Sequence, residues 1–509
     1  MKIEEMISAN RADCSGCEAC ANICPKNAIT MIRDAEGFAY PQIDPELCIK
    51  CGRCDATCPA LNYTKKAVTN LSPAFIAIYD NDKILRNSSS GGAFTALSEI
   101  ILKEGGVVFG AAYDKFWHVR HDSAKTLEEL EKLRSSKYVQ SQIGDVYRQA
   151  KKFLDSGVKV LFSGTPCHCA ALKHFLGKDY ENLLTVEVIC HGVPSPALWE
   201  SYIDEVGYAH KITGVNFRSK RNIWGGTGTS YLDIIFADRG HIISANSNNP
   251  YGRLFLRNLS LRPSCGSCKF RFPNMQSDLS LGDAWGIKDF APERFDNRGV
   301  SVVFIHTAKG KEFFERANLN PQPVRFAEAV NKNRLFIAPT TFDSRREKFF
   351  AELAKSNDWY DVIQKYYAQD SEEIRKDTGK RSGAAFWKSL REILTPIRQQ
   401  FAQSVLVIAS VRKRDEQKVL SKFFEQNLKD CNVFFLQPKG DGQFVCSENF
   451  SGFKSDLKDV AALTDFVKKY DLKAIFVEKP LKFGKAFAST ADWIKSSGLP
   501  VRFFAQKTK

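Results

Sequence analysis

The chain has 509 residues, too many for one ordinary hydrophobic core, and this length predicts two to four domains. Its 43% hydrophobic and 26% charged residues are usual for a folded protein and exclude a disordered chain. The net charge of +15 arises mainly in residues 371–509, where 26 Lys and Arg oppose 16 Asp and Glu. No nucleic-acid motif accompanies that surplus, so we expect a solvated or partner-facing basic surface and no nucleic acid.

The N-terminus carries no recognisable targeting signal. The opening MKIEEMISANRADC lacks an apolar core, and no later run approaches the roughly 18 apolar residues of a membrane span. We therefore expect a cytoplasmic protein without membrane insertion.

Residues 1–66 contain eight cysteines in two matching runs, each spaced Cys-x2-Cys-x2-Cys-x3-Cys-Pro. This is the spacing of bacterial two-cluster ferredoxins, in which the fourth cysteine of each run binds the other cluster. We expect one 4Fe-4S cluster on Cys14, Cys17, Cys20 and Cys58, and a second on Cys24, Cys48, Cys51 and Cys54. Zinc is the alternative, but this doubled pattern is not the paired spacing of zinc fingers.

Residues 70–345 predict a mixed α/β domain after a polar linker at 62–70. Strands are expected at PAFIAIYD, VVFGAAYD, VKVLFSG and LLTVEVIC. Helices are expected after SSSGG, at about 145–155, after TPCHC and from Ser195. Residues 212–247 alternate in the manner of β-structure, and CGSCKF and SDLSLGDAWGI follow.

The remaining residues predict two further parts. Residues 346–402 have an amphipathic helical pattern typical of a connector or packing arm. In residues 403–509, the apolar runs SVLVIAS, NVFFLQP, KAIFVEK and VRFFA predict a small parallel sheet in a C-terminal α/β unit whose role the sequence does not indicate. The fold class is thus a multidomain α+β or α/β protein.

Four core cysteines occupy positions suited to a ligand site. Cys167 and Cys190 each follow a predicted strand, and the carboxyl edge of an α/β sheet is where ligands collect. A loop bringing Cys265 and Cys268 there would complete a third 4Fe-4S site. A structural zinc on the same four, or a Cys265 and Cys268 site alone, are the alternatives. The other cysteines, Cys169, Cys431 and Cys446, are expected to be inert thiols.

The core resembles the family of beta subunits of coenzyme F420 hydrogenases and dehydrogenases, which includes 7-hydroxymethyl chlorophyll a reductase. The similar strings are NSSSGGAF, SSKYVQS, FSGTPCHCAALKHFL, CHGVPSP and CGSCKF followed by DLSLGDAWG, within residues 70–345. The resemblance implies a mixed α/β domain that binds FAD and one 4Fe-4S cluster, with Cys167, Cys190, Cys265 and Cys268 as its cluster ligands. Residues 403–509 fall outside it.

A flavin fits this expectation because it can exchange single electrons with clusters and hydrides with organic substrates. The Gly-rich turn before a predicted helix is suited to the FAD pyrophosphate. The expected flavin contacts are Ser88, Ser89, Ser90, Gly91, Gly92, Lys137, Tyr138, Gly164 and Thr165. Arg218 or Lys220 are candidates for an anionic ligand, and Tyr138, His168 and His191 are candidate proton donors.

Three functions remain open from the sequence. The first is a ferredoxin-linked, flavin-dependent oxidoreductase acting on a small-molecule substrate or a deazaflavin. The second is an electron-transfer subunit that relays electrons to a partner oxidoreductase. The third is a binding protein built on a core that has lost its flavin. Ferredoxin or another oxidoreductase subunit is the expected redox partner.

Overall fold

The computed structural model describes residues 2–68, 71–208, 210–220, 230–238 and 240–378, together with six strands between residues 405 and 505. The chain divides into two compact units. The first comprises Met1–Ala209, Val215–Asp233 and Ile243–Tyr367, and the second comprises His210–Gly214, Ile234–Ile242 and Ala368–Lys509. None of the helices in the described part combines the length and apolar character needed to span a membrane.

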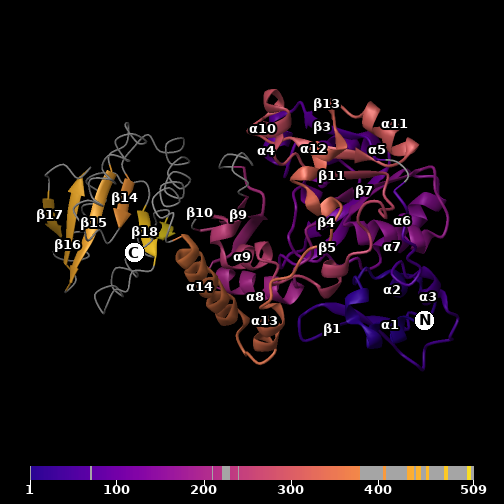
Figure 1. Ribbon diagram of the computed structural model, residues 1–509, viewed down its shortest axis with the longest axis horizontal. Coiled ribbons are helices and arrows are strands. Elements are labelled where there is room, and N and C mark those ends of the chain that lie inside the picture. Colours follow the sequence, from indigo (N-terminus) through magenta and orange to yellow (C-terminus); the bar gives the residue numbers. More distant parts are fainter. Residues whose placement is uncertain are drawn as a thin grey trace. The chain divides into compact units, whose positions relative to one another are not determined.

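The N-terminal segment folds into short helices and strands (Figure 1). Each proline that follows a cysteine run comes just after a short helix, because proline cannot continue the backbone hydrogen-bond ladder. These helices begin after Glu18 and Gly52, both in the left-handed conformation. The elements are α1 (Ile3–Ala9), η1 (Arg11–Asp13), α2 (Ala19–Ile23), the antiparallel strands β1 (Ile29–Arg33) and β2 (Ala39–Ile43), and α3 (Arg53–Thr57).

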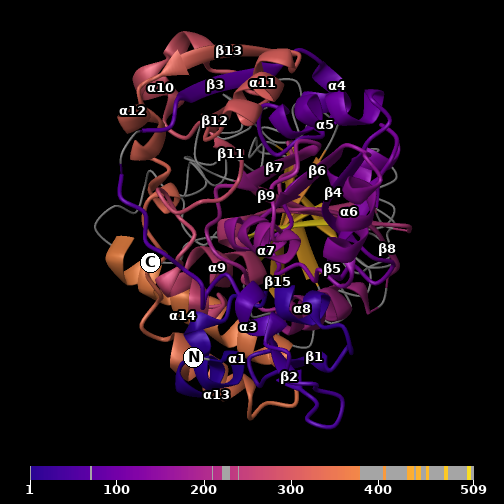
Figure 2. The same cartoon turned by 90° about the vertical axis from the view of Figure 1, so that its right-hand side faces the viewer.

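An eight-stranded mixed sheet forms the centre of the first unit. Its order is β13-β3-β12-β11-β7-β6-β4-β5, which Figure 2 shows running from β13 at the top. The strands are β3 (Ala74–Tyr79), β4 (Val107–Tyr113), β5 (Val119–Ala124), β6 (Val160–Gly164), β7 (Leu183–Val188), β11 (Leu279–Asp283), β12 (Ser301–Ile305) and β13 (Leu319–Val324). Five of them, β3, β4, β6, β7 and β11, run in one direction, so their carboxyl ends share one edge.

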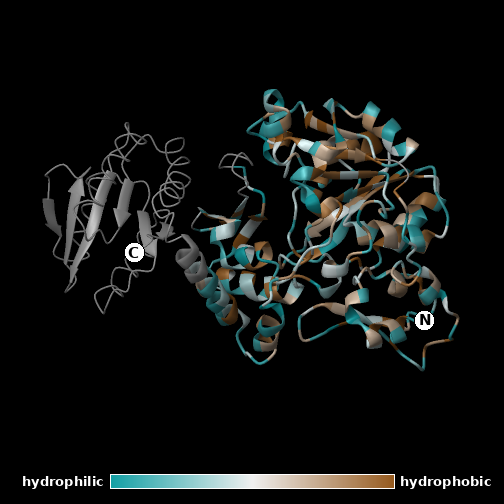
Figure 3. Ribbon diagram, in the orientation of Figure 1, coloured by the Kyte–Doolittle hydropathy of each residue, from teal (hydrophilic) through white to brown (hydrophobic). Residues whose placement is uncertain are grey.

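Helices cover both faces of this sheet, whose strands consist largely of hydrophobic residues, brown in Figure 3. On one face α5 and α11 pack on Leu184, Val186 and Leu279. On the other face α6 and α7 cover β4 and β6, and α12 covers β3 and β12. These helices and turns are α4 (Asp82–Arg86), α5 (Ala93–Lys103), η2 (Glu129–Leu133), α6 (Val146–Asp155), α7 (Pro166–Leu176), α8 (Pro196–Gly207), α10 (Ile287–Phe290), η5 (Pro292–Arg294), α11 (Ala308–Arg316), α12 (Phe326–Asn331) and η6 (Arg334–Phe336).

The second face contains a polar strip between its two apolar clusters. Side chains alternate across a strand, so Thr185 and Glu187 of β7 face away from Leu184 and Val186. Ser280 of β11 pairs in register with Glu187, and Asp278 lies just before that strand. We call Thr185, Glu187, Asp278 and Ser280 the polar strip, and all four are buried.

A smaller three-stranded sheet and five helical segments complete the described residues before 379. The strand order is β10-β9-β8, at the place where alternating β-structure was predicted. The elements are β8 (Ile212–Asn216), β9 (Tyr231–Phe236), β10 (Gly240–Ala245), η3 (Asn246–Asn248), α9 (Pro250–Leu256), η4 (Pro263–Ser267), α13 (Arg346–Leu353) and α14 (Trp359–Thr378). The rest of the segment predicted as a helical connector, residues 379–402, lies outside the described residues.

The C-terminal part contains a six-stranded sheet of order β17-β16-β15-β14-β18-β19. The four apolar runs predicted as a parallel sheet form β15, β14, β18 and β19, which are parallel neighbours. Two antiparallel strands that the sequence did not indicate, β16 and β17, extend it. The strands are β14 (Val405–Ile408), β15 (Val433–Gly440), β16 (Gln443–Glu448), β17 (Lys454–Leu457), β18 (Ile475–Lys479) and β19 (Val501–Ala505). The mixed α/β multidomain fold is thereby confirmed.

Candidate functional site

The first thiol-lined cavity lies within the N-terminal segment. It gathers one cysteine from the second run with three from the first, as the crossed pattern predicts, and its thiols belong to Cys14, Cys17, Cys20 and Cys58. Apolar side chains such as Ile3 and Met6 complete the wall. Burial raises the pKa of the Cys17 and Cys20 thiols, and neighbouring sulfurs raise them further. Bound iron would supply the positive charge that holds such thiols as thiolates.

The second N-terminal set lies nearer the surface. Cys51 is exposed, while Cys24, Cys48 and Cys54 are partly buried. Cys54 is close enough to Cys48 for the second sulfur to raise its pKa, although burial is the larger cause. The Ala28 N–H donates to Cys24 Sγ at 3.3 Å, the type of contact that stabilises a thiolate. This set is therefore the more accessible of the two.

A second cavity lies at the carboxyl edge of the large sheet and is lined by the four core cysteines, Cys167, Cys190, Cys265 and Cys268. Cys167 lies in the first turn of α7, directly after β6, and Cys190 follows β7, the neighbouring strand. The 3₁₀ turn η4 presents Cys265, and Cys268 follows at its C-cap. Burial raises the pKa of Cys167 to about 12 and that of Cys265 to about 11.

The two cavities share a wall. Ser15 lines both, between Cys14 on one side and the core cysteines on the other. Lys269, beside Cys268, forms an ion pair with Asp13 at 2.8 Å. A short through-protein path therefore joins the first N-terminal set to the core set.

Arg262 connects the same two regions. Its side chain is fully buried, at 0% exposure, and its guanidinium donates to the backbone oxygens of Cys14 at 2.9 Å and Ala39 at 3.0 Å. It also donates to Gln140 Oε1 and lies 3.8 Å from the Cys14 sulfur. At Gly16 a Cβ atom would come within 2.7 Å of this guanidinium, which explains why glycine stands there.

The donor chemistry of these sets fits iron–sulfur clusters. Each set supplies four soft sulfur ligands, the number that a 4Fe-4S cluster takes. In the described part of the chain, no three His, Cys, Asp or Glu side chains come close enough to share one metal ion. Among the remaining cysteines, Cys169 is buried in the apolar cluster under α7, Cys431 lies outside the described residues and Cys446 falls in β16.

The predicted flavin turn lies at the same edge of the sheet, between α4 and α5. Its glycines serve packing: a Cβ at Gly91 would lie 2.4 Å from the Ala77 oxygen, and Gly92 adopts φ +82° at the N-cap of α5. Ser88 Oγ donates to the Ile84 oxygen at 2.6 Å. The glycines and this hydroxyl thus have structural partners within the protein.

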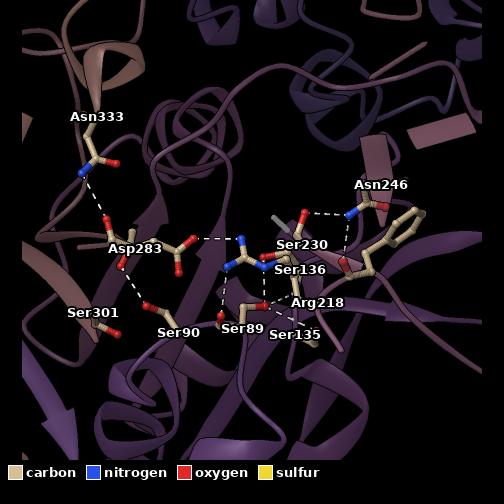
Figure 4. A network of polar contacts seen from close by, with 12 residues as sticks. Ser89, Ser90, Ser135, Ser136, Arg218, Ser230, Asn246, Asp283, Ser301 and Asn333 are labelled. Carbon is tan, nitrogen blue, oxygen red and sulfur yellow. Dashed lines mark hydrogen bonds and ion pairs between the residues drawn. The ribbon is translucent and has the colours of Figure 1, made fainter. Parts of the chain in front are cut away.

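A partly buried polar network surrounds the rest of this turn (Figure 4). Ser89 Oγ accepts from the Ser136 N–H at 2.8 Å, and Ser90 Oγ donates to the Val300 oxygen at 2.8 Å. Arg218 reaches the Ser89 oxygen at 3.1 Å. This network brings the turn together with the SSKYVQS and DLSLGDAWG segments, which are far apart in sequence.

Arg218 is held by an ion pair that the sequence did not reveal. Its guanidinium lies 2.8 Å from Asp283 Oδ2 at the end of β11, and both side chains are buried. It also donates to the Tyr138 hydroxyl at 3.0 Å and lies over the Trp285 ring at 5.5 Å. The Asp283 carboxylate raises the pKa of Arg218 against the opposing effect of burial. The DLSLGDAWG string, which contains Asp283, is the signal that could have found it.

Two lysines near the turn are partly buried, and loss of hydration around their ammonium groups lowers the pKa of each to about 7. Lys137 Nζ donates to backbone oxygens, among them that of Arg134 at 2.8 Å. Lys220 Nζ donates to the oxygens of Leu85 at 2.6 Å and Ser90 at 2.7 Å. These cations hold the backbone around the turn.

The other predicted contacts lie elsewhere on the same edge. Thr165 Oγ1 is 3.1 Å from Cys167 Sγ, so Gly164 and Thr165 adjoin the core cysteines. His168 is buried against His121 in an edge-to-face contact, and its Nδ1 makes no hydrogen bond within the described residues. His191 lies 2.5 Å from Asn258 Oδ1 and packs on Phe255.

Comparisons with known proteins match two segments of the chain. Residues 157–322 match the family described as the C terminus of the coenzyme F420 hydrogenase/dehydrogenase beta subunit, and residues 13–62 match the "4Fe-4S dicluster domain" family. The second match shows that the chain is an iron–sulfur electron-transfer protein.

Individual relatives are distant. An uncharacterized protein of Methanocaldococcus jannaschii is 25% identical over 62% of this chain and 89% of its own length. A subunit of the F(420)H(2) dehydrogenase of Methanosarcina mazei is 23% identical over 34% of this chain and 50% of its own length. Among solved structures, the F420-reducing [NiFe] hydrogenase complex from Methanosarcina barkeri has a chain with 19% identity and a TM-score of 0.36, covering 62% of this chain and 96% of that one.

The cysteine runs at the N-terminus and the core segments around Cys167, Cys190 and Cys265 both lie inside these family matches. Residues 157–322 thus form a C-terminal domain of the coenzyme F420 hydrogenase/dehydrogenase beta-subunit family, and residues 13–62 form a 4Fe-4S dicluster ferredoxin domain.

Proposed function

We propose that this chain is an iron–sulfur flavoprotein oxidoreductase that exchanges electrons between its ferredoxin domain, residues 1–66, and FAD in residues 70–345. The final acceptor or donor would be a small organic molecule or a deazaflavin coenzyme. When bound, 4Fe-4S clusters carry one electron at a time, and a flavin exchanges electrons singly or as a hydride.

The observation that supports this proposal most strongly is the wall shared by the two thiol-lined cavities. Ser15 contacts both, and Arg262 and the Lys269–Asp13 ion pair fasten the N-terminal segment to the core beside it. A ferredoxin segment that merely accompanied the core would not need a buried arginine at this place. The arrangement suits electron exchange between the first N-terminal set and the core set.

The cysteines would act as ligands in the three sets described, with the core set holding a third 4Fe-4S cluster. The exposed position of Cys51 makes the set of Cys24, Cys48, Cys51 and Cys54 the side at which an external ferredoxin or oxidoreductase subunit would exchange electrons. Burial of Cys14, Cys20 and Cys58 keeps water from their sulfurs, which favours reversible electron transfer over loss of iron.

The serine turn and its network would hold FAD. Arg218, fixed by Asp283, and Tyr138 form a rigid polar wall beside Ser89, so a ligand anion here would meet an oriented guanidinium. The N-terminus of α5, capped by Gly92, adds a positive helix end at this place. Lys137 and Lys220 keep the surrounding carbonyls in position.

Iron and flavin counting on full-length protein purified without oxygen tests the proposal. Three clusters predict about 12 Fe per chain, with released flavin in equal amount. A Cys190→Ser variant should lose about four Fe, while Cys169→Ser, the matched control on the same helix as Cys167, should keep all of them. Eight Fe plus zinc, or no flavin on denaturation, would contradict it.

An electron-transfer subunit is the second candidate function. It is favoured by the exposed thiol set around Cys51 and by a relative whose name describes a dehydrogenase subunit. In that case the isolated chain would accept electrons from reduced ferredoxin but would not reduce organic acceptors or deazaflavins. Turnover by the isolated chain would decide for the enzyme.

A further inference from the structure

The polar strip leads to a row of hydrogen bonds that the cluster and flavin sites do not use. Glu187 of β7 is joined to Ser280, Ser280 to His306 just after β12, and His306 to Ser72 just before β3. The three distances are 2.6 Å, 2.7 Å and 2.8 Å. Glu187 is 2% exposed, whereas Ser72 and His306 are partly exposed, so the row runs from the surface into the core.

The donors along this row all point inward. Ser280 has one hydroxyl proton, which it donates to Glu187 Oε1, so it must accept from His306 Nε2. His306 is then protonated at Nε2, and its Nδ1 accepts from the Ser72 hydroxyl. Each group gives a proton to the next and can receive one from the group before, which is the arrangement needed for proton transfer.

The inner end is a carboxylate in an apolar setting. Burial raises the pKa of Glu187 to about 7, and the hydroxyls of Ser280 and Ser277 and the charge of Arg271 only partly offset this. Oε2 makes no hydrogen bond within the described residues, although the Ser277 hydroxyl lies nearby. The Cys169 thiol on α7 faces the same carboxyl. Glu187 is therefore poised to change protonation with a small change in local charge.

The middle group is set to remain neutral. Burial lowers the pKa of His306 to about 4, with Lys66 lowering it and Asp278 raising it. A neutral imidazole can accept at Nδ1 and donate at Nε2, which lets it pass a proton without storing one. Asp278 itself accepts from Thr185 and Thr307 and takes no part in the row.

The inner end lies next to the core thiol site. Arg271 donates to the Cys190 oxygen at 2.8 Å and also acts on the Glu187 carboxylate. Glu187 lies on β7, and Cys190 lies three residues later in the loop after that strand. An added negative charge at the core thiol site would thus be felt at Glu187 as a rise in proton affinity.

We propose that Ser72, His306 and Ser280 conduct one proton from water to Glu187 when an electron reaches the core four-cysteine site. This inference rests on the proposed function, because it needs a redox centre held by those cysteines. The electron comes from a reduced ferredoxin-type donor through the N-terminal domain. The proton comes from solvent at Ser72, and the Glu187 carboxylate becomes a carboxylic acid. The positive charge of the proton thus balances the negative charge of the electron that enters the core site.

The midpoint potential of the core cluster against pH tests the proposal. Full-length protein would be titrated anaerobically and followed by electron paramagnetic resonance. Between about pH 7 and the higher pKa of Glu187 in the reduced protein, the carboxyl is ionised only in the oxidised state, so each pH unit should make reduction tenfold less favourable, a fall of about 59 mV. Below the pKa of Glu187 the potential should level off, because the carboxyl is protonated in both states.

Different variants test the role of the Glu187 carboxyl and the role of the hydrogen-bonded path that leads to it. Glu187→Gln should remove the pH dependence, while Glu99→Gln, which makes the same change on α5 at the opposite face, should retain it. His306→Phe and Ser280→Ala should leave the equilibrium slope in place but slow cluster reduction after rapid mixing and abolish its solvent deuterium effect.

The outcomes distinguish the two proposals. Absence of a core-cluster signal in wild-type protein would refute the proposed function and this inference with it. A wild-type cluster with a flat potential, or a slope unchanged in Glu187→Gln, would refute the inference alone. Unchanged reduction kinetics in both path variants would show that protons reach Glu187 by another route and overturn the assigned path.

Discussion

Replacing Arg262 by methionine should lower the reduction potential of the cluster held by Cys14, Cys17, Cys20 and Cys58. The variant removes a fully buried positive charge but keeps a side chain of similar length. A cation near a cluster stabilises the added electron of its reduced state. Its loss therefore makes reduction harder.

The magnitude follows from the contact. Arg262 Nη2 is 3.8 Å from the Cys14 sulfur. Two unit charges about 4 Å apart interact by about 4 kcal/mol at an effective dielectric constant of 20. The added electron is spread over the cube, so roughly half of this energy, about 2 kcal/mol, applies, which corresponds to a fall of about 90 mV for a one-electron couple.

The assay is a redox titration of anaerobic protein followed by electron paramagnetic resonance, with iron measured on the same sample. Arg262→Lys is the control: it keeps the charge, so it should restore most of the potential even though a lysine cannot reproduce the bonds to both Cys14 and Ala39. An unchanged potential in a methionine variant that retains all its iron would refute the reasoning.

Three further variants test other parts of the site. Asp283→Asn leaves the Arg218 cation buried without its partner and should destabilise the protein by about 3–5 kcal/mol in chemical unfolding; a loss below about 1 kcal/mol would contradict a buried pair. Gly16→Ala should displace the Arg262 guanidinium and shift the signal of the adjacent cluster, whereas Gly52→Ala, which meets no neighbour within 4 Å, should not. Cys58→Ser should weaken the buried cluster and spare the one around Cys51, and the reverse finding would reject the crossed ligand sets.

The sequence predicted what depends on local pattern. The cysteine spacing with its two prolines fixes short helices and turns, so the grouping of Cys58 with the first run could be expected from residues 14–58 alone. The placement of Cys167 and Cys190 at strand ends also followed, because β6 and β7 are mostly apolar and turn residues come directly after them.

The sequence could not predict contacts between distant segments. In sequence, the antiparallel strands β5, β12 and β13 cannot be distinguished from parallel ones, because strand direction in the sheet depends on pairing partners elsewhere in the chain. Asp283 and Arg218 are 65 positions apart, and only the fold brings them together. Arg262 looks like a surface residue before a proline, and its burial is set by the docking of the N-terminal segment.

That docking limits how freely the protein can be rearranged. Arg262 belongs to the core but satisfies carbonyl groups at Cys14 and Ala39, so the two parts complete each other's polar interior. Removal of residues 1–66 would deprive the Arg262 guanidinium of its acceptors at Cys14 and Ala39. A foreign ferredoxin in their place would need a glycine at the position of Gly16 to leave room for this guanidinium. Replacing the N-terminal domain by another electron donor would therefore require redesign of the interface around Arg262, because the two parts share buried hydrogen bonds.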